Sequence, residues 1–381
     1  MIFESFRPIA RVLRAGAATI LIVTLAGCFG GASKPKPTEL QPVTALVSAR
    51  QSWTARIGKV DFPLQPAVAG GNVALASANG TVALLDAQTG RDIWRLQLPT
   101  SIAAGVGSDG KLTAVVTREN EVVAIRDGRE IWRQKLNAQA FSAPFVAGGR
   151  VFILAADRSV NAFDGDTGRK LWSQQRPNEP LVLNQSGVML AVGDTLVVGM
   201  AGRVAGLNPV SGSPRWELPI ASPRGINDVE RLVDLVGRAS RDGDNVCARA
   251  FQAAIGCVNA ARGSLLWTKP ANGVNGLSGD DRLLFGTEAD GTVIAWKRAD
   301  GERVWSTDRL RYRNLSAPLV AGRSVVVGDL SGFVHLLSRD DGSLLNRLPT
   351  DGSAIIAAPV LVGTTLIVVT QNGGVFGFQP E

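Results

Sequence analysis

Short apolar runs alternate with turn residues along most of this chain, and the pattern repeats. Residues 73–94 read VALASANGTVALLDAQTGRDIW, and related stretches follow at 151–172, 283–305 and 325–346. Runs rich in Val, Ile and Leu that are bounded by Asn-Gly or Asp-Gly are typical of β-strands joined by tight turns. Each unit therefore predicts three successive strands, and an earlier strand, often marked by Ala-Pro, makes four.

A tryptophan recurs in these units about every forty residues. The tryptophans in this register are Trp53, Trp94, Trp132, Trp172, Trp216, Trp267 and Trp305. Their successive spacings are 41, 38, 40, 44, 51 and 38 residues, and the next position in register holds Asn346. Four strands per repeat of about 40 residues indicate the blades of a β-propeller. The tryptophan on each outer strand is then expected to pack between neighbouring blades.

The strands are apolar on both faces. Val82 and Leu84 point to one side of their strand, while Ala83 and Leu85 point to the other. A sheet with one solvated face would alternate apolar and polar residues. Because radial stacking of small sheets covers both faces, the pattern predicts an all-β propeller of four-stranded antiparallel blades.

The number of units predicts how the ring closes. Seven complete units run from about Phe62 to Leu348. Residues 355–379 then supply three strands without a fourth, and residues 50–57 supply a lone outer strand that contains Trp53. We expect the N-terminal strand to complete the last blade, which gives an eight-bladed β-propeller over residues 50–381.

The fifth interval is the longest, and its extra length falls between Pro219 and Asp244. Apolar residues within 229–236 have helix-like spacing, but the opening strand of the blade is equally expected there. Insertions in repeat proteins map to loops on one face, which is often the binding face. The segment is therefore either a binding loop or a tolerated surface loop.

Two of the three cysteines, Cys247 and Cys257, flank a hairpin of the fifth unit. We expect two-residue hairpin turns at Asn79-Gly80 and at the equivalent positions. That register places Cys247 opposite Val258, with the two thiols on opposite faces, and disfavours a cross-strand disulfide. A change of one residue in loop length would reverse this expectation.

The N-terminus predicts targeting rather than a folded element. Three arginines precede an apolar run at residues 15–26, which is too short to span a bilayer and ends in Leu-Ala-Gly before Cys28. We predict a signal peptide over residues 1–27. The Leu-Ala-Gly-Cys sequence resembles the lipobox of bacterial lipoproteins, which implies lipid attachment at Cys28; the alternative is an ordinary cleaved signal. Residues 28–49 would then form a flexible tether.

The composition argues against several kinds of chemistry. With 3 Cys and 1 His, the chain offers no tetrahedral zinc cluster and no two-histidine metal site. His335 is expected to be packed or to face a partner rather than to act as a catalyst, because no nucleophile motif accompanies it. Part of the formal charge of +7 lies in the signal peptide, and the remaining basic residues are dispersed, which argues against nucleic acid. We predict no catalytic residues, no metal and no cofactor.

The repeat, with its Asp-x-x-Thr-Gly turn followed by Trp, resembles that of quinoprotein-like propellers. Together with the lipobox, residues 224–235, 309–342 and 358–378 resemble the BamB family of outer-membrane protein assembly factors, and the most specific piece is GDLSGFVHLL. The resemblance implies a non-catalytic, periplasm-facing lipoprotein of the outer membrane that binds the POTRA domains of BamA within the β-barrel assembly machinery. Phe29 follows the cysteine where Asp would resemble an inner-membrane retention signal. Unfolded outer-membrane proteins are a further implied partner.

The resemblance also implies a docking face at two loops, which match residues 181–184 and 230–234 of this chain. Apolar side chains would anchor the partner at the centre, and charged side chains would orient it. The implied partner-binding residues are Leu181, Leu183, Arg231 and Asp234.

Two departures put one contact in doubt, because the family usually has Arg where Asn184 stands and a second acidic residue near Val236. Leu181 and Leu183 could equally be alternate residues of a blade's first strand. On the docking hypothesis, Arg231→Glu combined with Asp234→Arg would weaken partner retention and leave thermal stability nearly unchanged.

Two other functions remain open on the same fold. One is a dehydrogenase that carries a quinone cofactor, but such enzymes often have a pair of adjacent cysteines, which this sequence lacks. The other is a propeller that binds a ligand or the cell wall. Fold alone does not decide between them.

Overall fold

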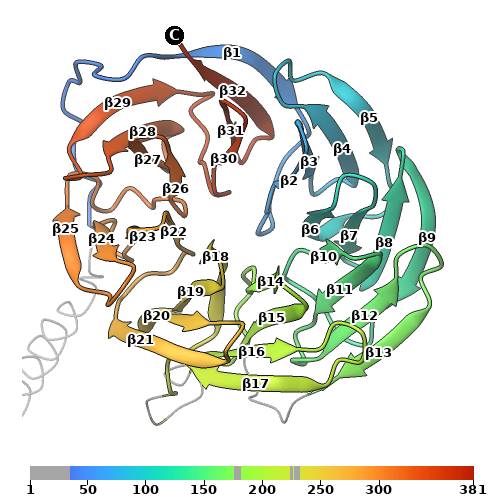
Figure 1. The fold of residues 1–381 in the computed structure, drawn as a ribbon. Helices are drawn as coiled ribbons and strands as arrows, with labels where there is room; N and C mark the ends of the chain where they lie inside the picture. Colours follow the sequence, from blue (N-terminus) through green and yellow to red (C-terminus); the bar gives the residue numbers. More distant parts are fainter. Residues whose placement is uncertain (1–34, 176–181, 224–225, 227–231) are drawn as a thin grey trace, which may run out of the picture. The chain divides into compact units, whose positions relative to one another are not determined.

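A computed structural model describes residues 35–175, 182–223, 226 and 232–381. Within these residues there are 32 strands and no helix. The strands form eight four-stranded antiparallel sheets, arranged as blades in a ring (Figure 1). The predicted all-β, eight-bladed propeller is confirmed.

The blades follow one another along the chain, and in each the first strand lies nearest the centre (Figure 1). Blade 1 comprises β2 (Ala67–Ala69), β3 (Asn72–Ala76), β4 (Thr81–Asp86) and β5 (Asp92–Gln97), and blade 2 comprises β6 (Ile102–Ser108), β7 (Thr113–Thr117), β8 (Glu121–Arg126) and β9 (Arg129–Lys135). Blade 3 comprises β10 (Phe145–Ala147), β11 (Arg150–Leu154), β12 (Val160–Asp164) and β13 (Lys170–Gln174), and blade 4 comprises β14 (Met189–Val192), β15 (Thr195–Met200), β16 (Arg203–Leu207) and β17 (Pro214–Pro219). Blade 5 comprises β18 (Leu235–Asp242), β19 (Asn245–Ala250), β20 (Ala254–Asn259) and β21 (Ser264–Pro270), and blade 6 comprises β22 (Ser278–Gly279), β23 (Leu283–Thr287), β24 (Val293–Lys297) and β25 (Arg303–Thr307). Blade 7 comprises β26 (Leu319–Ala321), β27 (Ser324–Gly328), β28 (Phe333–Ser338) and β29 (Leu344–Pro349), and blade 8 comprises β30 (Val360–Val362), β31 (Thr365–Val369), β32 (Gly374–Pro380) and β1 (Ala49–Arg56).

The two ends of the ring-forming chain meet in blade 8. The strand β1 pairs antiparallel with β32 from Ala49 opposite Pro380 to Arg56 opposite Gly374. The blue and red ends of the colour scale therefore lie side by side in Figure 1. This confirms that the N-terminal strand completes the last blade.

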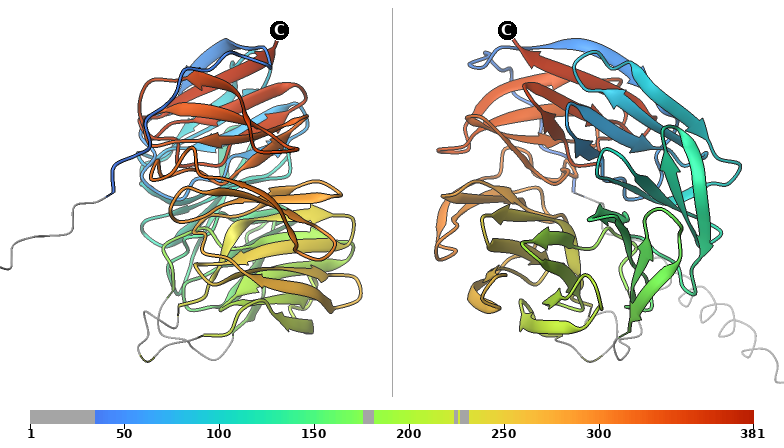
Figure 2. Two further views of the ribbon diagram at one scale, coloured as in Figure 1. Left: turned by 90° about the vertical axis from the view of Figure 1, so that its left-hand side faces the viewer. Right: turned by 45° about the vertical axis from the view of Figure 1, so that its right-hand side comes forward.

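The chain is bound to the ring before β1 begins. Residues 38–48, which we call the strap, run along blades 6 and 7 and are the blue segment beside the orange and red strands in the left view of Figure 2. Arg313 Nη1 donates to Thr38 O at 3.0 Å, and Arg347 Nη2 donates to Gln41 O at 3.0 Å. The compact unit that contains the ring spans Thr38–Glu381.

Each tryptophan of the register packs against a glycine in the second turn of the next blade. A Cβ atom on Gly90, for example, would lie 2.3 Å from Trp53 Cε3. The seven pairs are Trp53–Gly90, Trp94–Gly128, Trp132–Gly168, Trp172–Gly212, Trp216–Gly263, Trp267–Gly301 and Trp305–Gly342. All seven glycines have φ between 62° and 74°, a region that residues with a Cβ rarely adopt.

Indole hydrogen bonds reinforce these joints. Trp132 Nε1 donates to Gly165 O at 2.8 Å, and Trp305 Nε1 donates to Arg339 O at 2.9 Å. Trp53, Trp172 and Trp267 make the same bond to a carbonyl of the neighbouring turn. The turn is itself ordered by its aspartate, since Asp86 Oδ1 accepts from Thr89 N at 2.8 Å.

The eighth position of the register, Asn346, lacks a tryptophan for a topological reason. The neighbouring blade is the one that β1 closes, so no turn connects its third and fourth strands. Asn346 Nδ2 instead donates to Val47 O of the strap at 2.8 Å. The strap thus supplies the acceptor carbonyl that a turn of the next blade supplies at other joints.

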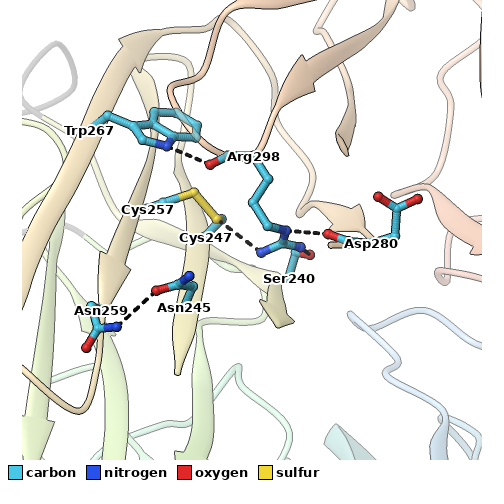
Figure 3. The surroundings of a disulfide bond; sticks show 8 residues. All are labelled: Ser240, Asn245, Cys247, Cys257, Asn259, Trp267, Asp280 and Arg298. Atoms are coloured by element: carbon cyan, nitrogen blue, oxygen red, sulfur yellow. Dashed lines mark hydrogen bonds between the residues drawn. A yellow bond between two sulfur atoms is a disulfide. The ribbon is translucent and has the colours of Figure 1, made fainter. Parts of the chain in front are cut away.

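The expected hairpin register in blade 5 is wrong by one residue. In blade 1, Gly80 N donates to Ser77 O and Ser77 N donates to Thr81 O, which closes a three-residue loop rather than a two-residue one. The same loop length in blade 5 places Cys247 directly opposite Cys257. The two cysteines form a disulfide, contrary to our expectation, because a one-residue shift moves every side chain to the other face (Figure 3).

The insertion after Trp216 contains an opening strand. β18 (Leu235–Asp242) lies within residues 219–244 and pairs with β19. Among the described residues of this segment there is no helix, so the strand is the alternative that the structure supports.

The tryptophan joints predict a large difference between two glycine substitutions. Gly168→Ala would force a Cβ to 2.7 Å from Trp132 Cδ2 at a positive φ, and we expect the free energy of unfolding to fall by about 2–4 kcal/mol. Gly71→Ala is the control, because Gly71 has no atom within 4 Å of the added Cβ. Urea unfolding of both variants measures the difference, and equal stabilities would contradict the joint.

Candidate docking face

The two loops implicated by the sequence directly precede the first strands of two neighbouring blades. Residues 182–188 lead into β14 of blade 4, and residues 232–234 lead into β18 of blade 5. Leu183 is in a loop and not in a strand, so the strand alternative does not apply to it. Leu181, Arg231 and Cys28 lie outside the described residues.

Asp234 joins these two loops. Its Oδ2 accepts a hydrogen bond from Leu183 N at 3.0 Å, and its Oδ1 accepts one from Arg158 Nη1 at 2.6 Å. Asp234 is 8% exposed and Arg158 is 6% exposed, so the ion pair is largely shielded from water. Residues from blades 3, 4 and 5 are thereby connected through one carboxylate.

Further backbone contacts hold the loops together. Gly237 N donates to Ser186 O at 2.7 Å, and Gly187 forms an isolated antiparallel bridge with Val236. Gly187 N also donates to Ser142 Oγ at 2.8 Å. The two loops consequently behave as one structural element, on which Leu183 is half-buried and Asn184 is exposed.

Arg158 is the site residue that the sequence did not reveal as such. It occupies the first-turn position that Gly80, Gly291 and Gly332 hold in other blades, and its φ is 61°. A long side chain at positive φ is unfavourable and persists only where the surroundings require it. In the sequence, the arginine at a position where several other units have glycine was the one sign that this residue has a special role.

A second residue outside the original prediction is Ile226. It lies in the same insertion, and its side chain is 99% exposed.

His335 is packed and does not face solvent, as one of the two sequence alternatives predicted. It is 0% exposed, and its Nε2 lies 2.9 Å from Asp329 Oδ2, which also accepts from Arg313 Nε at 2.7 Å. Burial lowers the pKa of His335, although Asp329 opposes the shift. The imidazole is therefore neutral near pH 7 and serves the packing of blade 7.

The described residues contain no group of three or more His, Cys, Asp or Glu side chains that could hold a metal ion. No helix within the same residues is long and apolar enough to cross a membrane.

Comparison with known proteins identifies the family. A model described as outer membrane protein assembly factor BamB matches residues 78–307. The BamB of Burkholderia pseudomallei is 38% identical over 97% of this chain and 100% of its own length, and that of Bordetella pertussis is 34% identical over 95% and 96%. The chain belongs to the BamB family. Members of this family are named assembly factors, which is a non-catalytic function.

Solved structures agree on the fold of this family member. BamB from Moraxella catarrhalis superposes with a TM-score of 0.79 at 22% identity, covering 87% of this chain and 99% of that one. A quinohemoprotein alcohol dehydrogenase from Comamonas testosteroni reaches 0.66 at 14% identity, covering 88% and 77%. Both likenesses concern the fold alone, so the dehydrogenase adds no argument for an enzyme.

The buried ion pair predicts a stability cost that the sequence alone did not suggest. Asp234→Asn removes the carboxylate that bridges Arg158 Nη1 and Leu183 N, and we expect the free energy of unfolding to fall by about 1.5–3 kcal/mol. The control is Asp166→Asn, which removes an exposed pair with Arg126 and should change stability by less than about 1 kcal/mol. Denaturant unfolding compares the two, and a neutral Asp234→Asn would show that the pair does not hold the loops.

His335 predicts a pH dependence of stability, and it is the only histidine in the chain. Since its pKa is lowered in the folded state, the unfolded chain takes up the proton first as pH falls through about 6.5. The free energy of unfolding should therefore fall from pH 7.5 to pH 5.5. His335→Gln should flatten this slope in urea titrations, whereas an unchanged slope would assign it to another group.

Proposed function

We propose that this protein is a lipid-anchored scaffold of the outer-membrane β-barrel assembly machinery. It would bind the POTRA domains of BamA and assist the folding and insertion of outer-membrane proteins from the periplasmic side. The observation that carries the proposal is family membership along nearly the whole chain, with relatives named for this assembly function. The protein would act through binding surfaces rather than through chemistry.

The anchor is proposed at Cys28, through acylation in the outer membrane. The strap supports this arrangement, because it binds the chain to blades 6 and 7 from Thr38 onward. Thr38 lies ten positions after Cys28. At about 3.3–3.6 Å per residue, that length permits at most about 35 Å between the acylated residue and the ring.

The proposed docking face consists of the two loops that Asp234 joins. Leu181 and Leu183 would supply apolar anchors, Arg231 would orient the partner by charge, and Asp234 would keep the two loops in register. Asp234 supports this role because its carboxylate contacts Leu183 N and Arg158 at the same time. Asp234 would then contribute to docking by holding the loops in position, and not by presenting an exposed charge to the partner.

A partner-capture experiment tests the proposal. Tagged full-length protein would be purified from detergent-solubilised outer membranes, and BamA would be quantified against the bait. We expect Leu183→Asp to reduce recovered BamA at least tenfold while the thermal unfolding midpoint stays within about 2 °C. The control is Val210→Asp, since Val210 is an exposed apolar residue on the second turn of blade 4, away from the two loops.

The outcomes separate the function from the site. Absence of BamA with the unsubstituted protein, folded and anchored, would contradict the assembly function. Full recovery with Leu183→Asp would leave the function intact and place the docking face elsewhere.

A further inference from the structure

The inner strands of the blades surround a central channel of about 690 Å³. This volume is in the range of small-molecule sites. Its walls combine apolar side chains with side-chain amides and very few charges. The apolar members include Pro63, Phe145 and Met189, and the amides include Gln65, Asn184 and Gln185.

Arg238 provides an uncompensated positive charge in this channel. Among the described lining residues the other charged one is Asp61, which pairs with Arg118 at 2.8 Å. The guanidinium of Arg238 forms no ion pair or hydrogen bond with any residue that the structure describes. The side chain of Arg238 is exposed to the solvent of the channel and is therefore accessible to a ligand.

The backbone fixes where Arg238 stands. Gly237 N donates to Ser186 O of the segment entering blade 4, and Leu277 N, before blade 6, donates to Arg238 O at 2.7 Å. Gly276 packs so closely that a Cβ there would lie 2.0 Å from Arg238 N. The position of the arginine on β18 is therefore set from both sides without any bond to its side chain.

A second donor approaches from the opposite part of the ring. Gln65 precedes β2 of blade 1, while Arg238 is in β18 of blade 5, and both strands face the centre in Figure 1. A Cβ added to Gly237 would lie 2.7 Å from Gln65 Nε2, which places the carboxamide beside β18. The backbone of Gln65 is held by its bonds to Gly105 O and Val106 N, and its side chain has no hydrogen-bond partner among the described residues.

We propose that the central channel binds a monocarboxylate that carries an apolar group, with Arg238 as the charge partner and Gln65 as a second donor. A guanidinium presents several N–H donors in one plane, which suits a carboxylate. One uncompensated cation matches one negative charge, and the proline, phenylalanine and methionine walls suit a hydrocarbon substituent. The proposal is independent of the docking function.

A carboxylate of this kind has two sources, a small organic acid or the free carboxyl terminus of a peptide. Their recognition chemistry is the same at Arg238. They differ in whether the channel must also accept a polypeptide backbone, and the experiment below separates them.

The test is a ligand-observed NMR titration of the full-length protein in detergent. The first pair of probes is N-acetyl-L-phenylalanine and its carboxamide, which differ in the negative charge. We expect the acid to bind at least about tenfold more tightly than the amide, because a charge-assisted hydrogen bond is about twice as strong as a neutral one. Equal binding of the two, or no binding of the acid, would overturn the proposal without any substitution.

The second arm uses variants. Arg238→Gln should weaken binding of the acid to the level of the amide, and Gln65→Ala should weaken it by a smaller factor. Arg91→Gln is the control, since Arg91 is an exposed arginine outside the channel. Unchanged affinity in Arg238→Gln, with its unfolding midpoint preserved, would contradict the assignment.

The third arm identifies the source. N-acetyl-Ala-Ala-Phe with a free terminus is compared with the same peptide amidated. If the free-terminus peptide binds as well as the single amino acid, the channel accepts chain ends. If it does not, the ligand is a small acid, and the site itself stands in either case.

Discussion

The contact on which this ring depends is the packing of an outer-strand tryptophan against a turn glycine of the next blade. It occurs at seven of the eight joints, and in each the glycine has a positive φ that leaves its Cα face open to the indole. Because the interaction always crosses between blades, each blade is incomplete without its neighbour. The Trp–Gly contacts therefore join neighbouring blades into a ring, whereas strand pairing acts within each blade.

Closure follows from the same contact. Trp53 is on β1, the strand that completes blade 8, and it packs against Gly90 of blade 1. The strap beside Asn346 substitutes for the one turn that the topology removes. The N-terminal segment thus has two roles, because it seals the ring and continues toward the proposed lipid anchor.

The sequence predicted these features because they repeat, and it failed where one particular tertiary contact decides. Blade number and ring closure followed from periodicity, whereas the sequence left His335 as either packed or facing a partner. The Cys247–Cys257 disulfide was not expected. The pairing of the two strands depends on whether the hairpin loop has two or three residues, and a sequence such as Asn79-Gly80 does not specify which. The burial of Asp234 was equally inaccessible, because Arg158 comes from another blade and is adjacent only in the folded ring. Local patterns carry no information on such pairs.

Both proposed functions of this protein depend on binding surfaces of the ring. Asp234 makes two loops into one element, and the inner strands hold Arg238 in a channel without a counter-ion. The two regions adjoin, because Asn184 and Gln185 of the first loop also line the channel.

The most direct test of the account is site-specific photo-crosslinking in living cells, with a photoreactive amino acid placed at residue 183 or at residue 210. Position 183 lies on the proposed docking face, and position 210 is an exposed site on the second turn of blade 4. The account predicts a crosslink to BamA from position 183 and none from position 210. Crosslinks from 210 alone, or from neither position in a folded and anchored protein, would contradict it.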